Sequence, residues 1–438
     1  MNIKNLLKGD NNILAKGLAS TVIKLLGALF SYLLSYLIAK KFGAEGNGLF
    51  ALFMSYIIVL STFFYFGLDF FLVRQVSILI QNNRFQEVKE LYFKILTKYI
   101  IPVAIISIFF GIIFGAYFNK TMVFTITIAV IINVFTDINS AVLRGMKKAE
   151  WYSFFMQFSK YFVVVILFFV PVLSNESESI IYLYILSLLI NGTLSFSILN
   201  KYLRTTSSGD LLKENNNQDS IFSILNSSKE FFFSSIIIIS LVWIDFIIAD
   251  VFLDEKSVGI YSVSLKLATL ISFGFTAFNA FLAPRISEVY AVHNTEKLER
   301  LITQNFVLIL PTILIPFIGI IFFNEDLLKF FGDEFKSGWI VLLLLAFGQF
   351  INSAFGPVSL LLQMTGNQKI FQNILVFALG FKLISSFVFV NSFGIEGIAL
   401  ASFLSLSLWT ILGSYYVYKK IGVFSWFSVS ELKKIIKV

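Results

Sequence analysis

Cysteine is absent from this chain of 438 residues, and histidine occurs once, as His293. Without cysteine there can be no disulfide, no thiolate nucleophile and no cysteine-ligated metal. A single histidine is too few for a histidine-based metal centre or proton relay. Charged residues are also scarce, at 14% of the chain, whereas a soluble domain carries roughly 25%. These shortages predict a protein without metal or cofactor whose surroundings are mostly lipid.

The chain is rich instead in long apolar runs. Hydrophobic residues make up 57% of it, phenylalanine occurs 53 times, and the mean hydropathy is +0.84. About twelve runs reach the roughly 20 residues that a helix needs to cross a bilayer. Backbone groups in lipid must hydrogen-bond within their own segment, which selects helices. The predicted fold class is an all-α integral membrane protein, with spans at 15–39, 48–71, 93–117, 122–143, 152–173, 180–201, 231–252, 258–282, 301–323, 338–362, 370–391 and 395–418.

Lysine and arginine are concentrated in alternate loops, on the side that holds the N-terminus. Because basic loops favour the cytoplasmic side, both chain ends are predicted to be cytoplasmic, in a multi-pass protein of the inner (cytoplasmic) membrane. The formal net charge of +8 is spread between apolar segments, so it does not form the basic patch that a nucleic acid would need. We therefore expect a membrane partner and no nucleic acid.

One short joint occurs twice in the chain. KKFGAEGNGLFALF (40–53) follows the first predicted span, and VFLDEKSVGIYSVS (251–264) follows the seventh. Each crosses a short turn that contains acidic residues. The next apolar run then begins with a glycine, an aliphatic residue and an aromatic residue, which are Gly48-Leu49-Phe50 and Gly259-Ile260-Tyr261. The repeat predicts two parallel six-helix halves, an arrangement with which transporters enclose a central cavity, although glycine–aromatic turns are also common at helix starts. The predicted divisions are an N-terminal half, 1–203, a polar cytoplasmic linker, 204–229, and a C-terminal half, 230–438.

Several charged residues fall inside predicted spans. A charge at the centre of a bilayer costs about 2.5–3.5 kcal/mol, so each must face protein or water. Lys24, Lys266 and Lys382 lie deep within their spans and predict a cationic interior that attracts phosphate or pyrophosphate. Structural ion pairs, such as a lysine with Asp245, and helix–helix hydrogen bonds remain open alternatives. The candidate binding residues are Lys24, Lys266, Lys382, Asp245, Asp137, Asn352 and Gln349.

Four longer motifs stand out in the sequence: SLVWIDFIIADVFLDEKSVGIYSVSLKLATL (240–270), FGLDFFLVRQ (66–75), AVLRGMKKAEWY (141–152) and FGIEGIALAS (393–402). With these motifs, the chain is similar over nearly its whole length to the polysaccharide flippases of the MOP exporter superfamily, the Wzx-like group. The resemblance implies a V-shaped bundle, as in MATE transporters, that moves undecaprenyl-pyrophosphate-linked oligosaccharide between leaflets. Related lipid II flippases carry functional cations in spans one and eight, which match Lys24 and Lys266 here.

The resemblance predicts a transporter rather than an enzyme. Alternating access would expose the lysines to each side in turn, with coupling to H+ or Na+ through Asp245 or Asp137. Expected partners are the lipid-linked oligosaccharide, membrane lipid, a polysaccharide polymerase and a chain-length regulator. One alternative is a MATE-type multidrug or cation antiporter, which would need intramembrane carboxylates that span one lacks. Another is an integral-membrane polysaccharide polymerase, for which the sequence offers no large external loop, carboxylate pair or histidine base.

Overall fold

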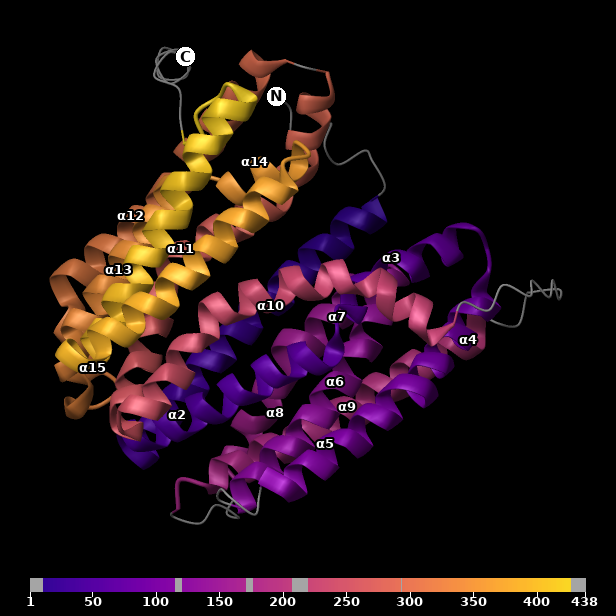
Figure 1. Ribbon diagram of the computed structural model, residues 1–438, viewed down its shortest axis with the longest axis horizontal. Helices are drawn as coiled ribbons and strands as arrows, with labels where there is room; N and C mark the ends of the chain where they lie inside the picture. Colours follow the sequence, from indigo (N-terminus) through magenta and orange to yellow (C-terminus); the bar gives the residue numbers. More distant parts are fainter. Residues whose placement is uncertain (1–10, 115–119, 171–175, 207–219, 293, 427–438) are drawn as a thin grey trace. The chain divides into compact units, whose positions relative to one another are not determined.

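The computed structural model describes residues 11–114, 120–170, 176–206, 220–292 and 294–426, and the regular secondary structure of this part is entirely helical (Figure 1). His293, half of the predicted linker (207–219) and both chain ends lie outside the described residues. The elements are α2 (Asn11–Tyr65), α3 (Leu68–Gln81), α4 (Phe85–Ile95), η1 (Leu96–Ile100), α5 (Ile101–Phe114), α6 (Lys120–Gly145), α7 (Ala149–Ser153), η2 (Phe154–Phe158), α8 (Ser159–Phe168), α9 (Ser179–Thr206), α10 (Ile221–Phe252), α11 (Glu255–Ala291), α12 (Thr295–Lys329), η4 (Asp333–Gly338), α13 (Trp339–Ala354), α14 (Val358–Met364) and α15 (Gln368–Ile421).

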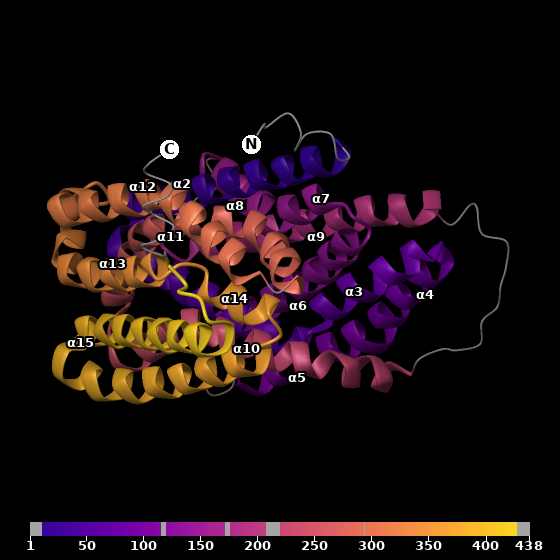
Figure 2. The same cartoon turned by 90° about the horizontal axis from the view of Figure 1, so that it is seen from above.

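The described helices account for about twelve membrane passages. Ten helical stretches are long and apolar enough to cross a membrane, and two of these have 47 and 54 residues. A straight helix of that length would measure roughly 70–80 Å, whereas the hydrocarbon core is about 30 Å thick. Both are broken by a glycine with non-helical backbone angles, Gly43 in α2 and Gly394 in α15. Figure 2 shows the two limbs of α15 side by side. The predicted all-α membrane fold is confirmed.

Proline shapes the spans differently from place to place. The helix is interrupted at Pro357, because α13 ends at Ala354 and α14 begins at Val358. Proline has no N–H to continue the helical hydrogen bonds. Pro311 and Pro316 instead lie inside α12, whose non-helical residue is Phe323. The helices of the seventh and eighth predicted spans extend beyond the membrane, since α10 begins at residue 221 and α11 continues to 291. The seventh predicted span, 231–252, coincides with the apolar stretch of α10, Phe231–Phe252.

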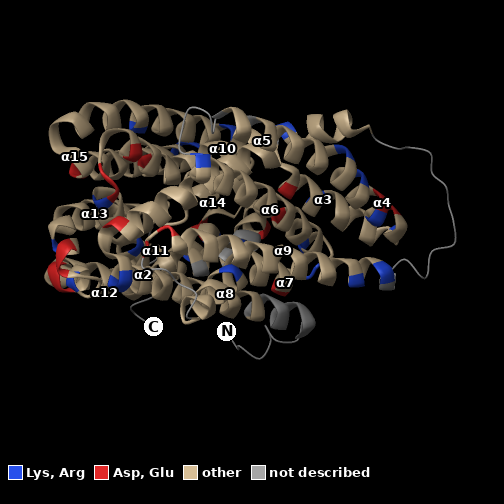
Figure 3. Cartoon of the chain, turned by 90° about the horizontal axis from the view of Figure 1, so that it is seen from below, with Lys and Arg blue, Asp and Glu red and all other residues tan. Residues whose placement is uncertain are grey.

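The chain divides into two compact units. Unit 1 comprises residues 1–38 and 53–239, and unit 2 comprises residues 39–52 and 240–438. The first joint, which includes Gly43, therefore belongs to unit 2, whereas the residues directly before and after it in sequence belong to unit 1. In unit 2, α11 packs against α12 and α13, and α13 packs against α15. In unit 1, the α3–α4 hairpin carries a concentration of charged residues (Figure 3).

Close packing in unit 1 involves small and hydroxylated residues of α2. Ser20 Oγ lies 2.6 Å from Ser153 Oγ on α7. A Cβ at Gly27 would lie 2.4 Å from the Gln157 carbonyl oxygen, so α2 approaches η2 backbone to backbone. Small and hydroxylated residues allow membrane helices to pack in this way. For Ser20 and Gly27, helix packing is the role that the structure shows.

In unit 2 the two joints contact each other reciprocally. A Cβ at Gly48 would lie 1.8 Å from the carbonyl oxygen of Glu255, and a Cβ at Gly259 would lie 1.9 Å from the carbonyl oxygen of Ala44. Ala44 and Glu255 each stand four residues before the glycine of their own joint. The two contacts are therefore equivalent, and each requires a residue without a side chain.

Gly259→Ala is expected to destabilise the protein by about 1–3 kcal/mol, the usual cost of overpacking. The new methyl would meet backbone atoms, which cannot rotate away. Gly380→Ala, in α15, is the matched control because a Cβ there has nothing within 4 Å; it should be neutral or stabilise by up to about 1 kcal/mol, since alanine favours helices. The thermal unfolding midpoints of both purified variants measure this, and equal midpoints would disprove close contact at the joint.

Candidate functional site

A buried ion pair lies within unit 2. Lys382 Nζ is 2.8 Å from Asp245 Oδ2, and the two side chains are only 4% and 3% exposed. Asp245 is on α10 and Lys382 is on the first limb of α15. Removing two charges from water is costly, and the pair is stable only if further hydrogen bonds surround it.

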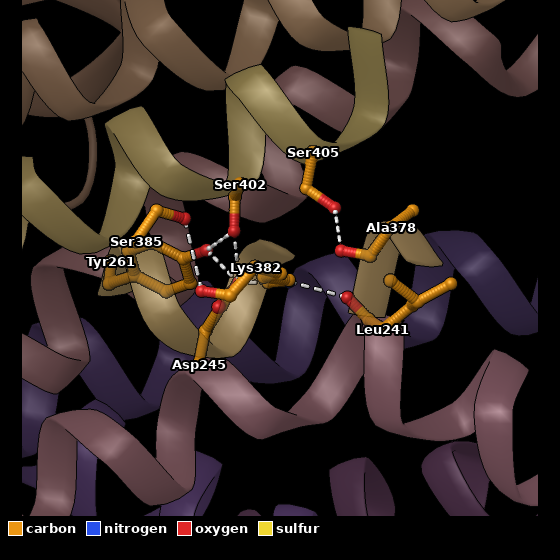
Figure 4. A network of polar contacts seen from close by, with 8 residues as sticks. All are labelled: Leu241, Asp245, Tyr261, Ala378, Lys382, Ser385, Ser402 and Ser405. Carbon is orange, nitrogen blue, oxygen red and sulfur yellow. Dashed lines mark hydrogen bonds and ion pairs between the residues drawn. The ribbon is translucent and has the colours of Figure 1, made fainter. Parts of the chain in front are cut away.

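Three neighbouring groups supply those hydrogen bonds (Figure 4). The hydroxyls of Tyr261 and Ser402 both donate to Asp245 Oδ2, and Lys382 Nζ also donates to the Leu241 carbonyl oxygen. One carboxylate oxygen thus receives three donors. The other, Asp245 Oδ1, is buried and accepts no hydrogen bond from the described part of the chain.

Local sequence explains how these groups meet. Leu241 and Asp245 are four residues apart on α10, so they lie on the same helical face. Tyr261 stands near the start of α11, and its ring packs edge-on against Phe246, with centroids 5.4 Å apart. The break at Gly394 returns α15 on itself and brings Ser402, on the second limb, toward the same carboxylate.

The structure places the remaining unit 2 candidates on other helices. Lys266 is half-buried on α11. Gln349 and Asn352 are half-buried on α13, and the Thr410 hydroxyl donates to Asn352 Oδ1 at 3.4 Å. The sequence left open which lysine pairs with Asp245, and the structure identifies Lys382.

Unit 1 holds the other two candidates. Asn133 Nδ2 donates to Asp137 Oδ2 at 3.0 Å, and the charges of Lys160 and Asp69 act on the same carboxylate. Lys24 is exposed on the first limb of α2, and it interacts electrostatically with Arg144 at the end of α6. Asp137 therefore has cationic and anionic neighbours, whereas the charge interaction of Lys24 is with another cation.

Sequence reasoning missed three members of the unit 2 site: Tyr261, Ser402 and the Leu241 carbonyl group. All three lie inside the motifs that carry the family resemblance, but nothing in the sequence pattern indicates that they hydrogen-bond to the ion pair. No group of three or more histidine, cysteine, aspartate or glutamate side chains that could hold a metal occurs among the described residues.

A family model described as "Polysaccharide biosynthesis protein" matches residues 13–291. The chain belongs to this family. A curated relative, the "Probable low-salt glycan biosynthesis flippase Agl15" of Haloferax volcanii, is 25% identical over 200 residues, which are 43% of this chain and 42% of that protein. The match thus spans less than half of the relative's length.

Solved structures show that the fold is that of MOP-superfamily transporters. The lipid II flippase MurJ in an inward closed conformation aligns with a TM-score of 0.68 at 15% identity, over 96% of this chain and 90% of that one. A MATE multidrug resistance transporter in an inward-facing conformation aligns with a TM-score of 0.65 at 15% identity, over 93% and 98%. At this identity the likeness establishes the fold alone. The family resemblance predicted from sequence is confirmed by the match to the family model.

Proposed function

We propose that the protein flips undecaprenyl-pyrophosphate-linked oligosaccharide units across the cytoplasmic membrane by alternating access, without catalysing a chemical reaction. The observation that carries this proposal is membership of the polysaccharide biosynthesis family in a chain that has the fold of MOP transporters. The partial match to a glycan biosynthesis flippase supports the same substrate class.

Lys24 and Lys266 are the residues we assign to the anionic headgroup. Lysine binds phosphate as a compact point charge and without fixed geometry, which suits a ligand that must be released on the opposite side. Lys24 is exposed and Lys266 is half-buried, so neither has the enclosure of Lys382. We assign Lys382 to holding Asp245, because its ammonium already has two acceptors inside unit 2.

Coupling to an ion gradient is assigned to Asp245 and Asp137. Asp245 Oδ2 accepts three hydrogen bonds, whereas Asp245 Oδ1 accepts none within the described residues. A proton would therefore add to Oδ1. Asp137 accepts a hydrogen bond from Asn133, besides having charged neighbours. We propose that H+ or Na+ exchange at one of these carboxylates drives the cycle.

The proposal predicts selectivity for the pyrophosphate-linked lipid. Purified protein in liposomes should move a fluorescently labelled undecaprenyl-pyrophosphate oligosaccharide to the outer leaflet, where dithionite quenches it, several-fold faster than protein-free liposomes do. The same sugar on a monophosphate should move more slowly, because a monophosphate carries less negative charge for the lysines to attract. Equal rates with and without protein would overturn the proposal.

A cation antiporter is the competing function, since MATE transporters share the fold. It predicts proton-driven uptake of a fluorescent organic cation such as ethidium into the same liposomes, with no movement of the lipid. Detecting that uptake alone would replace the proposed substrate class.

A further inference from the structure

The second limb of α2 begins without a cap of its own. Gly43, with φ 68° and ψ −161°, ends the first limb, and Ala44 opens the second. N–H groups at a helix start have no acceptor within the helix. The Ala44 N–H donates to Glu334 Oε1 at 2.6 Å, from a residue 290 positions further along the chain. Glu334 lies on η4, so this helix start is capped from elsewhere in unit 2.

The corresponding helix start in the second joint is capped locally. Gly43 stands five residues before Gly48, and Asp254 stands five residues before Gly259. The Asp254 carboxylate accepts the Ser257 N–H at 2.9 Å in the usual geometry of a helix N-cap. Hydrogen bonds from Ser257 lower the pKa of Asp254, which keeps this cap charged. The first joint has a glycine where the second has its capping carboxylate.

Glycine at position 43 also makes room for the distant carboxylate. A Cβ there would lie 2.6 Å from Glu334 Oε1. Glu334 Oε2 in turn lies 3.9 Å from Lys256 Nζ at the start of α11, with the two side chains 36% and 47% exposed. A charged acceptor at a helix N-terminus is favoured by the helix dipole. Glu334 therefore connects three segments: η4, the second limb of α2 and the start of α11.

We propose that Glu334 is a positioning residue that holds the first joint, residues 39–52, docked on the rest of unit 2, residues 240–438. When the joint leaves residues 240–438, the Ala44 N–H loses its acceptor, so the helix start is capped only while the joint is docked. The role goes beyond the proposed transport function, because it concerns the docking of the joint and not the binding of the substrate. Loss of one charge-assisted hydrogen bond should raise the undocked fraction on the order of tenfold.

The lack of cysteine allows one introduced thiol to report docking. Ala44→Cys keeps the backbone N–H, and Ala44 is 0% exposed. We would measure the rate at which a maleimide labels this variant of the full chain, purified in lipid nanodiscs. Labelling should be slow with Glu334 present and about tenfold faster with Glu334→Ala. Glu334→Gln should fall between the two, because its amide oxygen still accepts a hydrogen bond without the charge.

Two controls separate docking from general loss of structure. Asp333→Ala alters the neighbouring acid, whose side chain is 81% exposed and pairs with Lys336; it should leave the labelling rate at position 44 unchanged. Ala346→Cys, buried in α13, should label slowly with and without Glu334→Ala. The proposal is wrong if Glu334→Ala labels no faster than Asp333→Ala, or if it exposes position 346 equally. No substrate is needed, so this result and that of the flipping assay are independent.

Discussion

Lys382→Ala is expected to lower the free energy of unfolding by about 3–5 kcal/mol, the effect of removing one partner of a buried ion pair. The Asp245 side chain is 3% exposed, so its charge would remain in the protein interior without an ammonium beside it. The thermal unfolding midpoint of the purified protein measures the loss. Lys369→Ala is the matched control, because Lys369 is an exposed lysine on the same helix, α15, and it should leave the midpoint within error.

Removing both charges should restore most of that stability. Lys382→Met with Asp245→Asn keeps similar volumes, and the asparagine oxygen can still accept hydrogen bonds from Tyr261 and Ser402. Replacing a buried ion pair by neutral groups is often close to neutral in stability. A double variant as unstable as Lys382→Ala would show that the ammonium contributes through something other than the charge of Asp245. Flipping by the stable double variant then reports whether the Asp245 charge is needed for coupling.

Lys24→Ala and Lys266→Ala are each expected to reduce flipping of the pyrophosphate-linked lipid by roughly 10- to 100-fold, the worth of one charge-assisted contact with phosphate. Arginine at either position should restore part of the activity, because it keeps the charge. Glutamate should not, because it repels the headgroup. The rates come from the liposome assay with equal amounts of inserted protein.

Lys229→Ala is the control for both lysines. Lys229 is an exposed residue of α10 that lies before the membrane-crossing stretch and donates to Asn226. Its loss should leave the flipping rate unchanged. Full activity of Lys24→Ala or Lys266→Ala would remove that lysine from the substrate site, while leaving the role of the other to be judged by its own rate.

The positions of the membrane spans could be predicted from sequence because lipid imposes a simple condition on it. Each crossing needs about 20 apolar residues in a helix, and such runs are visible without any knowledge of packing. The joints around Gly48 and Gly259 were visible for a similar reason, since close backbone approach admits only glycine. What the sequence could not show was that these two joints contact each other.

The partners of the polar residues were decided by tertiary structure. Helical periodicity places Asp245 and Lys382 each on one face of its helix, but 137 residues separate them in the sequence. From sequence alone, Lys266 was an equally good partner for Asp245. The break at Gly394 brings the second limb of α15, with Ser402, to the same carboxylate. Likewise, no local pattern links Ala44 to Glu334. The sequence by itself determined that the chain lies in lipid, where its membrane spans fall, and which residue types are costly there. The tertiary structure determined which of those charged residues neutralise one another.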